Sequence, residues 1–177
     1  MDIALYQPDI PQNTGAILRL GACLGLPVHI IGPAGFSLSD RALRRAGLDY
    51  LARARLHPHD DWQAFWRWRE ASGRRLVLLT TGATRDYTDL IYRKDDILLC
   101  GQESGGVPPA IHGAAGVRVR IPMVPEARSL NVAVAVAMVA GEALRQLDAF
   151  PGKGAGEGES ADGTSETGYG SRSNDHG

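Results

Sequence analysis

The chain has 177 residues, of which 44 % are hydrophobic and 22 % are charged, and its formal net charge is −1. That length suits one domain with its own core, and the composition excludes a wholly disordered chain. Two cysteines are too few for a disulfide scaffold, the first residues lack a secretory signal, and no apolar run reaches the roughly 20 residues of a membrane span. We therefore expect a cytoplasmic protein with no membrane partner.

Charge is distributed unevenly along the chain. Residues 1–150 hold 17 of the 19 basic and 15 of the 20 acidic residues, whereas residues 151–177 hold 2 basic and 5 acidic residues. The last 27 residues include eight glycines and no aliphatic residue larger than alanine, so they cannot bury enough apolar surface to offset the entropy lost on ordering. We expect one folded domain over residues 1–150, followed by a disordered tail over residues 151–177.

The hydrophobic pattern predicts strands that alternate with helices. In chain order we expect a strand at 3–6, a helix at 13–24, a strand at 28–31, a helix at 39–46, a strand at 52–56, a helix from Trp62 to a stop at Gly73, strands at 76–80, 96–100 and 117–121, and a final helix at 129–147. Asn13 or Thr14 is expected to cap the first helix. The alternation indicates an α/β fold with a mainly parallel sheet, and strands that are apolar on both faces indicate helices on both faces.

Three of the expected strands end in segments suited to ligand binding, at residues 80–82, 101–106 and 122–131. Ligands of open parallel sheets bind beyond the carboxyl ends of the strands. The sequence lacks both the G-x-G-x-x-G dinucleotide fingerprint and the P-loop pattern, which excludes a P-loop hydrolase. Its five histidines are scattered without metal-ligand spacing, so we expect no metal site.

Several polar residues near these segments have two interpretations each. The glycine-rich loop at 101–106 is either a backbone cradle for a nucleoside-like ligand, with Glu103 beside it, or a turn whose Glu103 caps the helix expected near Pro108. Ser129 and Asn131 open the last expected helix, where capping is the default role, yet their side chains would face the strand ends. Arg19, judged from composition alone, is a surface arginine.

Three segments occur in a fixed order: N-T-G-A-I-L-R-L-G at 13–21, L-L-C-G-Q-E-S-G-G-V-P at 98–108 and I-P-M-V-P-E-A-R-S-L-N-V at 121–132. They resemble the three motifs of the SPOUT superfamily of knotted RNA 2′-O-ribose methyltransferases. The segment R-A-L-R-R-A-G-L-D-Y at 41–50 is similar to the smaller group that methylates the wobble nucleotide of tRNA, position 34, where it is cytidine or uridine. The resemblance covers residues 1 to about 148, the whole expected domain.

The resemblance implies a deep trefoil knot near the C-terminus, S-adenosylmethionine as methyl donor, a homodimer, and tRNA rather than DNA as partner, with no metal required. Carried over by position, it implies contacts to the donor from Leu79, Gly101, Ile121 and Ser129. It implies catalytic roles for Asn13, Arg19, Glu103 and Asn131. The chain departs from the family pattern at Gly105, Ala133, Val134 and Gly141, which bears on wobble-base contacts and dimer packing.

Four arginines carry the expected contacts to RNA. The family account makes Arg19 a general base, but a guanidinium with a pKa above about 12 is a poor base, so orienting the ribose hydroxyl and a neighbouring phosphate is an equal alternative. Arg41, Arg44 and Arg45 share one face of the helix expected at 39–46, because they are spaced by three and four residues. We expect this face to contact the anticodon stem-loop through phosphates, the alternative being a solvated face without a partner.

Other functional classes compete with this interpretation. One is a dinucleotide-dependent oxidoreductase with an atypical phosphate loop, which the misplaced glycines and the missing ribose-binding acid after the first strand disfavour. A second is a non-catalytic RNA-binding relative of the enzymes. A third is 2′-O-methylation at another site in tRNA or rRNA.

Overall fold

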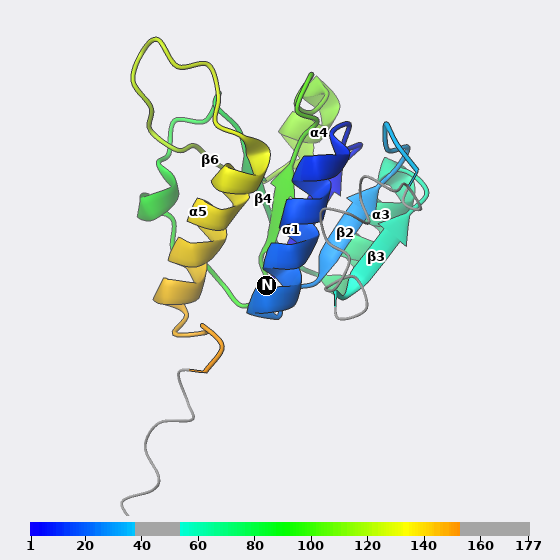
Figure 1. Ribbon diagram of the computed structural model, residues 1–177, viewed down its shortest axis with the longest axis horizontal. Coiled ribbons are helices and arrows are strands. Elements are labelled where there is room, and N and C mark those ends of the chain that lie inside the picture. Colours follow the sequence, from blue (N-terminus) through cyan, green and yellow to red (C-terminus); the bar gives the residue numbers. More distant parts are fainter. Residues whose placement is uncertain (38–53, 153–177) are drawn as a thin grey trace, which may run out of the picture.

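The computed structural model describes residues 1–37 and 54–152 as a single parallel sheet with helices packed on it (Figure 1). The strands are β1 (Asp2–Tyr6), β2 (Val28–Ile31), β3 (Leu56–His59), β4 (Leu76–Leu79), β5 (Ile97–Cys100) and β6 (Val117–Val119). They lie in the order β3-β2-β1-β5-β4-β6, and every pairing is parallel. The helices are α1 (Pro11–Leu24), α3 (Trp62–Ser72), α4 (Pro109–Ala114) and α5 (Val132–Gln146), with a short 3-10 turn η1 (Tyr87–Asp89). The predicted parallel α/β architecture is confirmed.

Helices cover both faces of the sheet, as the apolar strands predict. Because side chains alternate along a strand, Ile3 and Leu5 of β1 face one layer, while Ala4 and Tyr6 face the other. The first layer is filled by α1 and α5, which pack side by side (Figure 1). The second layer is filled by α3 and α4, and Phe65 of α3 is its largest fully buried side chain. No helix in these described ranges is long and apolar enough to cross a membrane.

The boundaries of two predicted elements are wrong by three or more residues, for identifiable reasons. The strand expected at 52–56 begins only at Leu56 and runs to His59. Pro58 argues against a strand at this position, because proline has no backbone N–H to donate. Strand β3 is nevertheless the edge of the sheet, where a missing backbone N–H is tolerated. The final helix begins at Val132 instead of residue 129, because Asn131 is its N-cap and ends the loop before it. The helix expected at 39–46 lies outside the described residues.

The capping predicted for the first helix is also wrong. Helix α1 begins at Pro11, whose missing N–H costs nothing in the first turn. Its cap residue is Ile10, which makes no side-chain cap bond. The Thr14 hydroxyl donates back to the Ile10 carbonyl within the helix, and the Asn13 amide points to a different loop. The Asn13 side chain therefore does not cap α1, and its amide is available to contact the loop after β5.

A buried polar cluster connects β1, β2 and β3 beneath α3. The His29 ring is 1 % exposed and lies between two partners, with Nδ1 2.9 Å from His59 Nε2 and Nε2 3.0 Å from Asp2 Oδ2. Arg74 pairs with the same Asp2 carboxylate. Trp68 packs on the His29 ring, with 4.3 Å between ring centroids. The cluster replaces apolar packing at this point of the core with a chain of hydrogen bonds between buried polar groups.

This cluster predicts a stability that decreases in mild acid. Burial, followed by the neighbouring His29 and His57 rings, lowers the pKa of His59 below its usual 6.5. The unfolded chain therefore binds a proton on His59 more readily than the folded chain, and stability is lost as pH falls below about 6.5. We expect a lower Tm at about pH 5.5 than at about pH 7.5, and a smaller decrease in His59→Gln, which cannot titrate. Equal decreases in both proteins, measured by calorimetry, would contradict this.

Candidate active site

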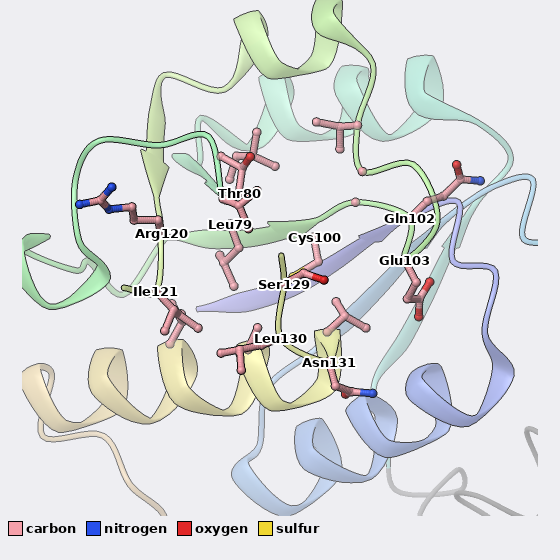
Figure 2. Close-up of a pocket in the computed structure, with 18 of the residues that line it drawn as sticks. Leu79, Thr80, Cys100, Gln102, Glu103, Arg120, Ile121, Ser129, Leu130 and Asn131 are labelled. Atoms are coloured by element: carbon pink, nitrogen blue, oxygen red, sulfur yellow. The ribbon is translucent and has the colours of Figure 1, made fainter. Parts of the chain in front are cut away.

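A cavity of about 460 Å³ lies at the carboxyl ends of β4, β5 and β6, beside the start of α5 (Figure 2). This volume is within the range of small-molecule sites in proteins. The three segments that the sequence placed at strand ends meet here. Their lining residues are Leu79, Thr80 and Thr81 at the end of β4, Gly101, Gln102, Glu103 and Gly106 after β5, and Ile121, Met123, Ser129, Leu130 and Asn131 between β6 and α5.

The cavity has an apolar side and a polar side. In Figure 2 the side chains of Leu79, Ile121 and Leu130 gather on one side, whereas Glu103 and Asn131 lie on the other. All four residues predicted to contact the donor line this cavity, as do Asn13, Glu103 and Asn131 from the predicted catalytic set. The arrangement suits a ligand with an apolar part and a polar part.

The loop after β5 folds back on itself so closely that a side chain at Gly101 has no room. Gln102 and Gly106 exchange two backbone hydrogen bonds of 2.9 and 2.8 Å. A Cβ on Gly101 would lie 2.4 Å from the carbonyl carbon of Gly106. Gly106 has a φ of +67°, a conformation that glycine adopts without strain. At Gly101 and Gly106 the wall of the cavity is therefore backbone, as in the cradle interpretation.

Glu103 does not cap a helix, so the alternative interpretation of this loop is wrong. Helix α4 has Pro108 at its cap position and no side-chain cap bond. The Glu103 carboxylate instead accepts a 3.1 Å hydrogen bond at Oε1 from Asn13 Nδ2 on α1. Asn13 Oδ1 in turn accepts a 2.9 Å bond from Asn131 Nδ2. Three residues from three distant segments thus form one hydrogen-bonded chain.

Asn131 combines its predicted capping role with a place in this chain. Its Oδ1 accepts from the backbone N–H groups of Ala133 and Val134, at 2.9 and 3.3 Å, at the start of α5. The N-cap prediction is confirmed for Asn131. Ser129 lies two residues earlier in the loop and contributes to the cavity wall instead of the helix. The cap bonds fix the Asn131 amide so that its Nδ2 faces Asn13.

Glu103 has an acidic neighbour, Asp9, which sequence reasoning missed. Asp9 lies in the loop between β1 and α1, and its backbone N–H donates to Glu103 Oε2 at 3.2 Å. Burial, together with the nearby Asp9 carboxylate, raises the pKa of Glu103 above its usual range. The only signal for Asp9 in the sequence was its place in the loop after the first strand.

Other catalytic chemistries find little support at this cavity. Cys100 lines it, but burial raises the pKa of the Cys100 thiol to about 12, so the thiol stays protonated and is a poor nucleophile. Across residues 1–37 and 54–152, no group of three or more His, Cys, Asp or Glu side chains could hold a metal ion. What the cavity does offer is shape, backbone groups and oriented amides, which suit binding and alignment.

The structure does not bring Arg19 to the cavity with the other predicted catalytic residues. Arg19 is exposed on α1 and is absent from the cavity lining. It follows Asn13 by six residues, which corresponds to about 9 Å along the helix axis. Arg41, Arg44 and Arg45 lie outside the described residues.

Comparison with known proteins gives a consistent family. Residues 1–141 match the SpoU rRNA Methylase family. A tRNA (cytidine(34)-2′-O)-methyltransferase from Beijerinckia indica is 60 % identical over 148 residues, which cover 84 % of this chain and 92 % of that protein. The protein of the same name from Escherichia coli K12 is 44 % identical over 154 residues, covering 86 % of this chain and 96 % of the relative.

Solved structures agree with these sequence matches. One, from work on the 2-OH methylation of C/U34 on tRNA, superimposes with a TM-score of 0.78 at 43 % identity and covers 83 % of this chain and 95 % of its own. Another is the SpoU methyltransferase AviRb from Streptomyces viridochromogenes in complex with the cofactor AdoMet. It has a TM-score of 0.77 at 26 % identity and covers 85 % of this chain and 58 % of its own.

Proposed function

The chain belongs to the SpoU rRNA methylase family, and we propose that it transfers the methyl group of S-adenosylmethionine to the ribose 2′-hydroxyl of cytidine or uridine 34 in tRNA. The observation that carries this proposal is the cavity at the strand ends, where the three sequence motifs meet. Relatives that share at least 40 % identity over nearly their whole length bear the name of this activity.

The cavity fits the donor. Leu79 and Ile121 provide apolar surface for the adenine ring, and the bare backbone at Gly101 and the loop at Ser129 provide polar groups for the remainder. Family members of similar fold bind AdoMet, which supports this assignment. When bound, the donor supplies a methyl group already activated by a sulfonium. The protein then needs to align the acceptor oxygen and assist the loss of one proton.

The polar side of the cavity provides that alignment. Asn13, Glu103 and Asn131 are fixed by their mutual hydrogen bonds, so they present a preformed surface to the ribose. Arg19 acts from outside the donor cavity, on the exposed face of α1, by orienting the hydroxyl and the neighbouring phosphate. In this proposal the cavity binds the donor, and Arg19 positions the RNA from outside the cavity.

We also propose that the C-terminal part forms a deep trefoil knot. Strand β6 lies at the edge of the sheet, whereas α5 packs against α1 and β5 at its centre. The connecting segment from 120 to 131 therefore returns across the strand ends, and it contributes Ile121, Met123 and Ser129 to the cavity. A crystal structure tests this proposal. The knot requires the chain after β6 to pass through the loop that precedes it, and a chain that passes outside that loop would contradict it.

Two copies of the chain are proposed to form a homodimer through α5. Val134 and Met138 lie one turn apart on the same face of this helix and are 49 % and 38 % exposed. Gly141 continues the face with no side chain, so a partner helix can approach it closely. Sedimentation of the full chain tests this, since a monomer at every concentration would contradict it.

The tRNA partner is proposed to bind through the arginines at 41, 44 and 45, by way of the anticodon stem-loop. We expect the combined change of Arg41, Arg44 and Arg45 to glutamate to weaken tRNA binding strongly. It should also reduce the slope of log K against log[salt] by about two to three, because each lost phosphate contact reduces that slope by roughly one. Donor affinity should persist, which provides the internal control. Filter-binding titrations over a range of salt concentrations give both quantities, and unchanged values would refute the proposal.

A methyl-transfer assay with two matched tRNAs tests the proposed function itself. One tRNA carries an ordinary ribose at nucleotide 34, and the other carries a 2′-deoxyribose there and so lacks the acceptor oxygen. With labelled donor, we expect incorporation into the first and none into the second. Equal incorporation would place the methyl group at another site. Binding of tRNA without any incorporation would instead indicate a non-catalytic RNA-binding relative.

A further inference from the structure

Asp9 connects two loops that are far apart in the sequence. Its carboxylate accepts the backbone N–H of Glu103 at 3.2 Å, the backbone N–H of Ser104 at 3.3 Å and the Ser104 hydroxyl. Its own backbone N–H donates to Glu103 Oε2 at 3.2 Å. Four hydrogen bonds thus attach the turn after β5 to the loop after β1, and Asp9 takes part in each of them.

The position of Asp9 is itself fixed from the opposite side. The loop after β2 donates from the Gly35 N–H to the Pro8 carbonyl at 2.9 Å. Gly35 lies so close that a Cβ there would be 3.1 Å from Asp9 Cα and 3.2 Å from Asp9 Cβ. Asp9 is only half-buried, yet its backbone is held between two neighbouring loops. It is therefore a fixed point against which the Glu103 turn can be placed.

The hydrogen bonds of the cavity run in one direction and end at Glu103. Asn131 donates to Asn13, and Asn13 donates to Glu103 Oε1. The second carboxylate oxygen, Oε2, accepts from Asp9. Both oxygens of Glu103 are thus engaged as acceptors, which favours the ionised form, because a carboxylate is the stronger acceptor. The orientation of both amides depends on where this carboxylate sits and on its charge.

We propose that Asp9 is a positioning residue for methyl transfer, holding the Glu103 turn so that the Glu103 carboxylate orients the Asn13 and Asn131 amides toward the ribose. This inference rests on the proposed function, because it assigns Asp9 a part in that reaction. Asp9 lines no part of the donor cavity, so its effect on the donor is indirect.

The charges of the pair give the proposal a second, independent signature. The Ser104 hydroxyl and the backbone N–H groups of Glu103 and Ser104 all donate to the Asp9 carboxylate and hold its pKa below the usual range, so Asp9 is ionised at neutral pH. Its negative charge in turn helps burial to raise the pKa of Glu103. Protonation of Glu103 removes an acceptor from the chain, so activity should decrease in acid. Removing the Asp9 charge should move that decrease to lower pH.

The substitution Asp9→Asn tests this, because asparagine has nearly the same shape but places an NH₂ group against the N–H donors of the turn. We expect kcat to decrease by about 10- to 100-fold, the range for reacting groups displaced by roughly 1 Å, with donor affinity within about threefold of the wild type. The acid limb of the kcat profile should shift to lower pH. Asp95→Asn, an identical change before β5 at the opposite end of the strand, should match the wild type.

Ser104→Ala provides a second variant should Asp9→Asn fold poorly, and it should show a smaller decrease in kcat. Hydrogen exchange at residues 102–104 gives a readout that needs no activity, and Asp9→Asn should exchange faster there. An unchanged kcat and acid limb, or unchanged exchange, would overturn the proposal, as would a loss of donor affinity equal to the loss of kcat. If the wild type transfers no methyl group to nucleotide 34, the proposed function fails, while the exchange data still decide whether Asp9 holds the turn.

Discussion

Replacing Gly101 with alanine should abolish donor binding and, with it, methyl transfer. The added Cβ would lie 2.4 Å from the carbonyl carbon and 2.6 Å from the carbonyl oxygen of Gly106, and both are backbone atoms that no side-chain rotation can move. The two backbone bonds between Gln102 and Gly106 would have to open to make room. Because this backbone forms the wall of the cavity, we expect the affinity for S-adenosylmethionine to fall at least about 100-fold, equivalent to roughly 2.7 kcal/mol.

Gly113→Ala is the matched control for this prediction. Gly113 lies in α4 with nothing within 4 Å of its added Cβ, and alanine favours a helix over glycine by up to about 1 kcal/mol. Calorimetric titration with S-adenosylmethionine compares the two variants directly, and a thermal melt reports whether each is folded. A folded Gly101→Ala that binds the donor within about twofold of the wild type would show that the loop opens at little cost.

Arg19→Ala should eliminate methyl transfer while leaving donor affinity nearly unchanged. Arg19 is exposed on α1 and does not line the cavity, so removing it alters no donor contact. Its proposed role is to orient the ribose hydroxyl and a phosphate, and loss of an oriented charge at a reacting group costs about 100- to 1,000-fold in rate. Arg19→Lys should recover little, because an ammonium lacks the planar fork of donors that a guanidinium presents.

Arg67→Ala is the control for Arg19, since Arg67 is also exposed on a helix but lies on the opposite face of the sheet. Single-turnover methylation of tRNA gives the rate, and calorimetry gives donor affinity. Parallel loss of both in Arg19→Ala would move Arg19 from the RNA side of the reaction to the donor side. Full activity would remove it from the proposed mechanism.

The fold was largely predictable because β1, β2, β4 and β5 are short, largely apolar runs, and β6 alternates apolar and polar residues. The exception, β3, contains Pro58, and only its place at the edge of the sheet makes that residue acceptable. A sequence does not state which strand is at an edge. The order β3-β2-β1-β5-β4-β6 likewise follows from crossover connections that no local pattern records.

The candidate site was predictable only in part. Residues within local motifs could be predicted, whereas residues that act through partners far away in the sequence could not. Gly101, Glu103 and Asn131 lie in segments with recognisable motifs, so their presence in one cavity could be anticipated. Asp9 could not be identified, because its significance comes from hydrogen bonds to residues 94 and 95 positions away. Capping was misjudged at Asn13 for the same reason, since a partner 90 residues away takes up its amide.

The order of the strands has a consequence for the newly made chain as it leaves the ribosome. Strand β1 pairs with β2 soon after both are synthesised, but its other neighbour, β5, emerges about 90 residues later. Strand β4 is made shortly before β5, whereas β6 and helix α5, which complete the cavity, are made after it. A nascent chain therefore exposes one edge of β1 for most of its synthesis. It acquires the ability to bind a ligand only when Val139, the last residue that lines the cavity, has left the exit tunnel.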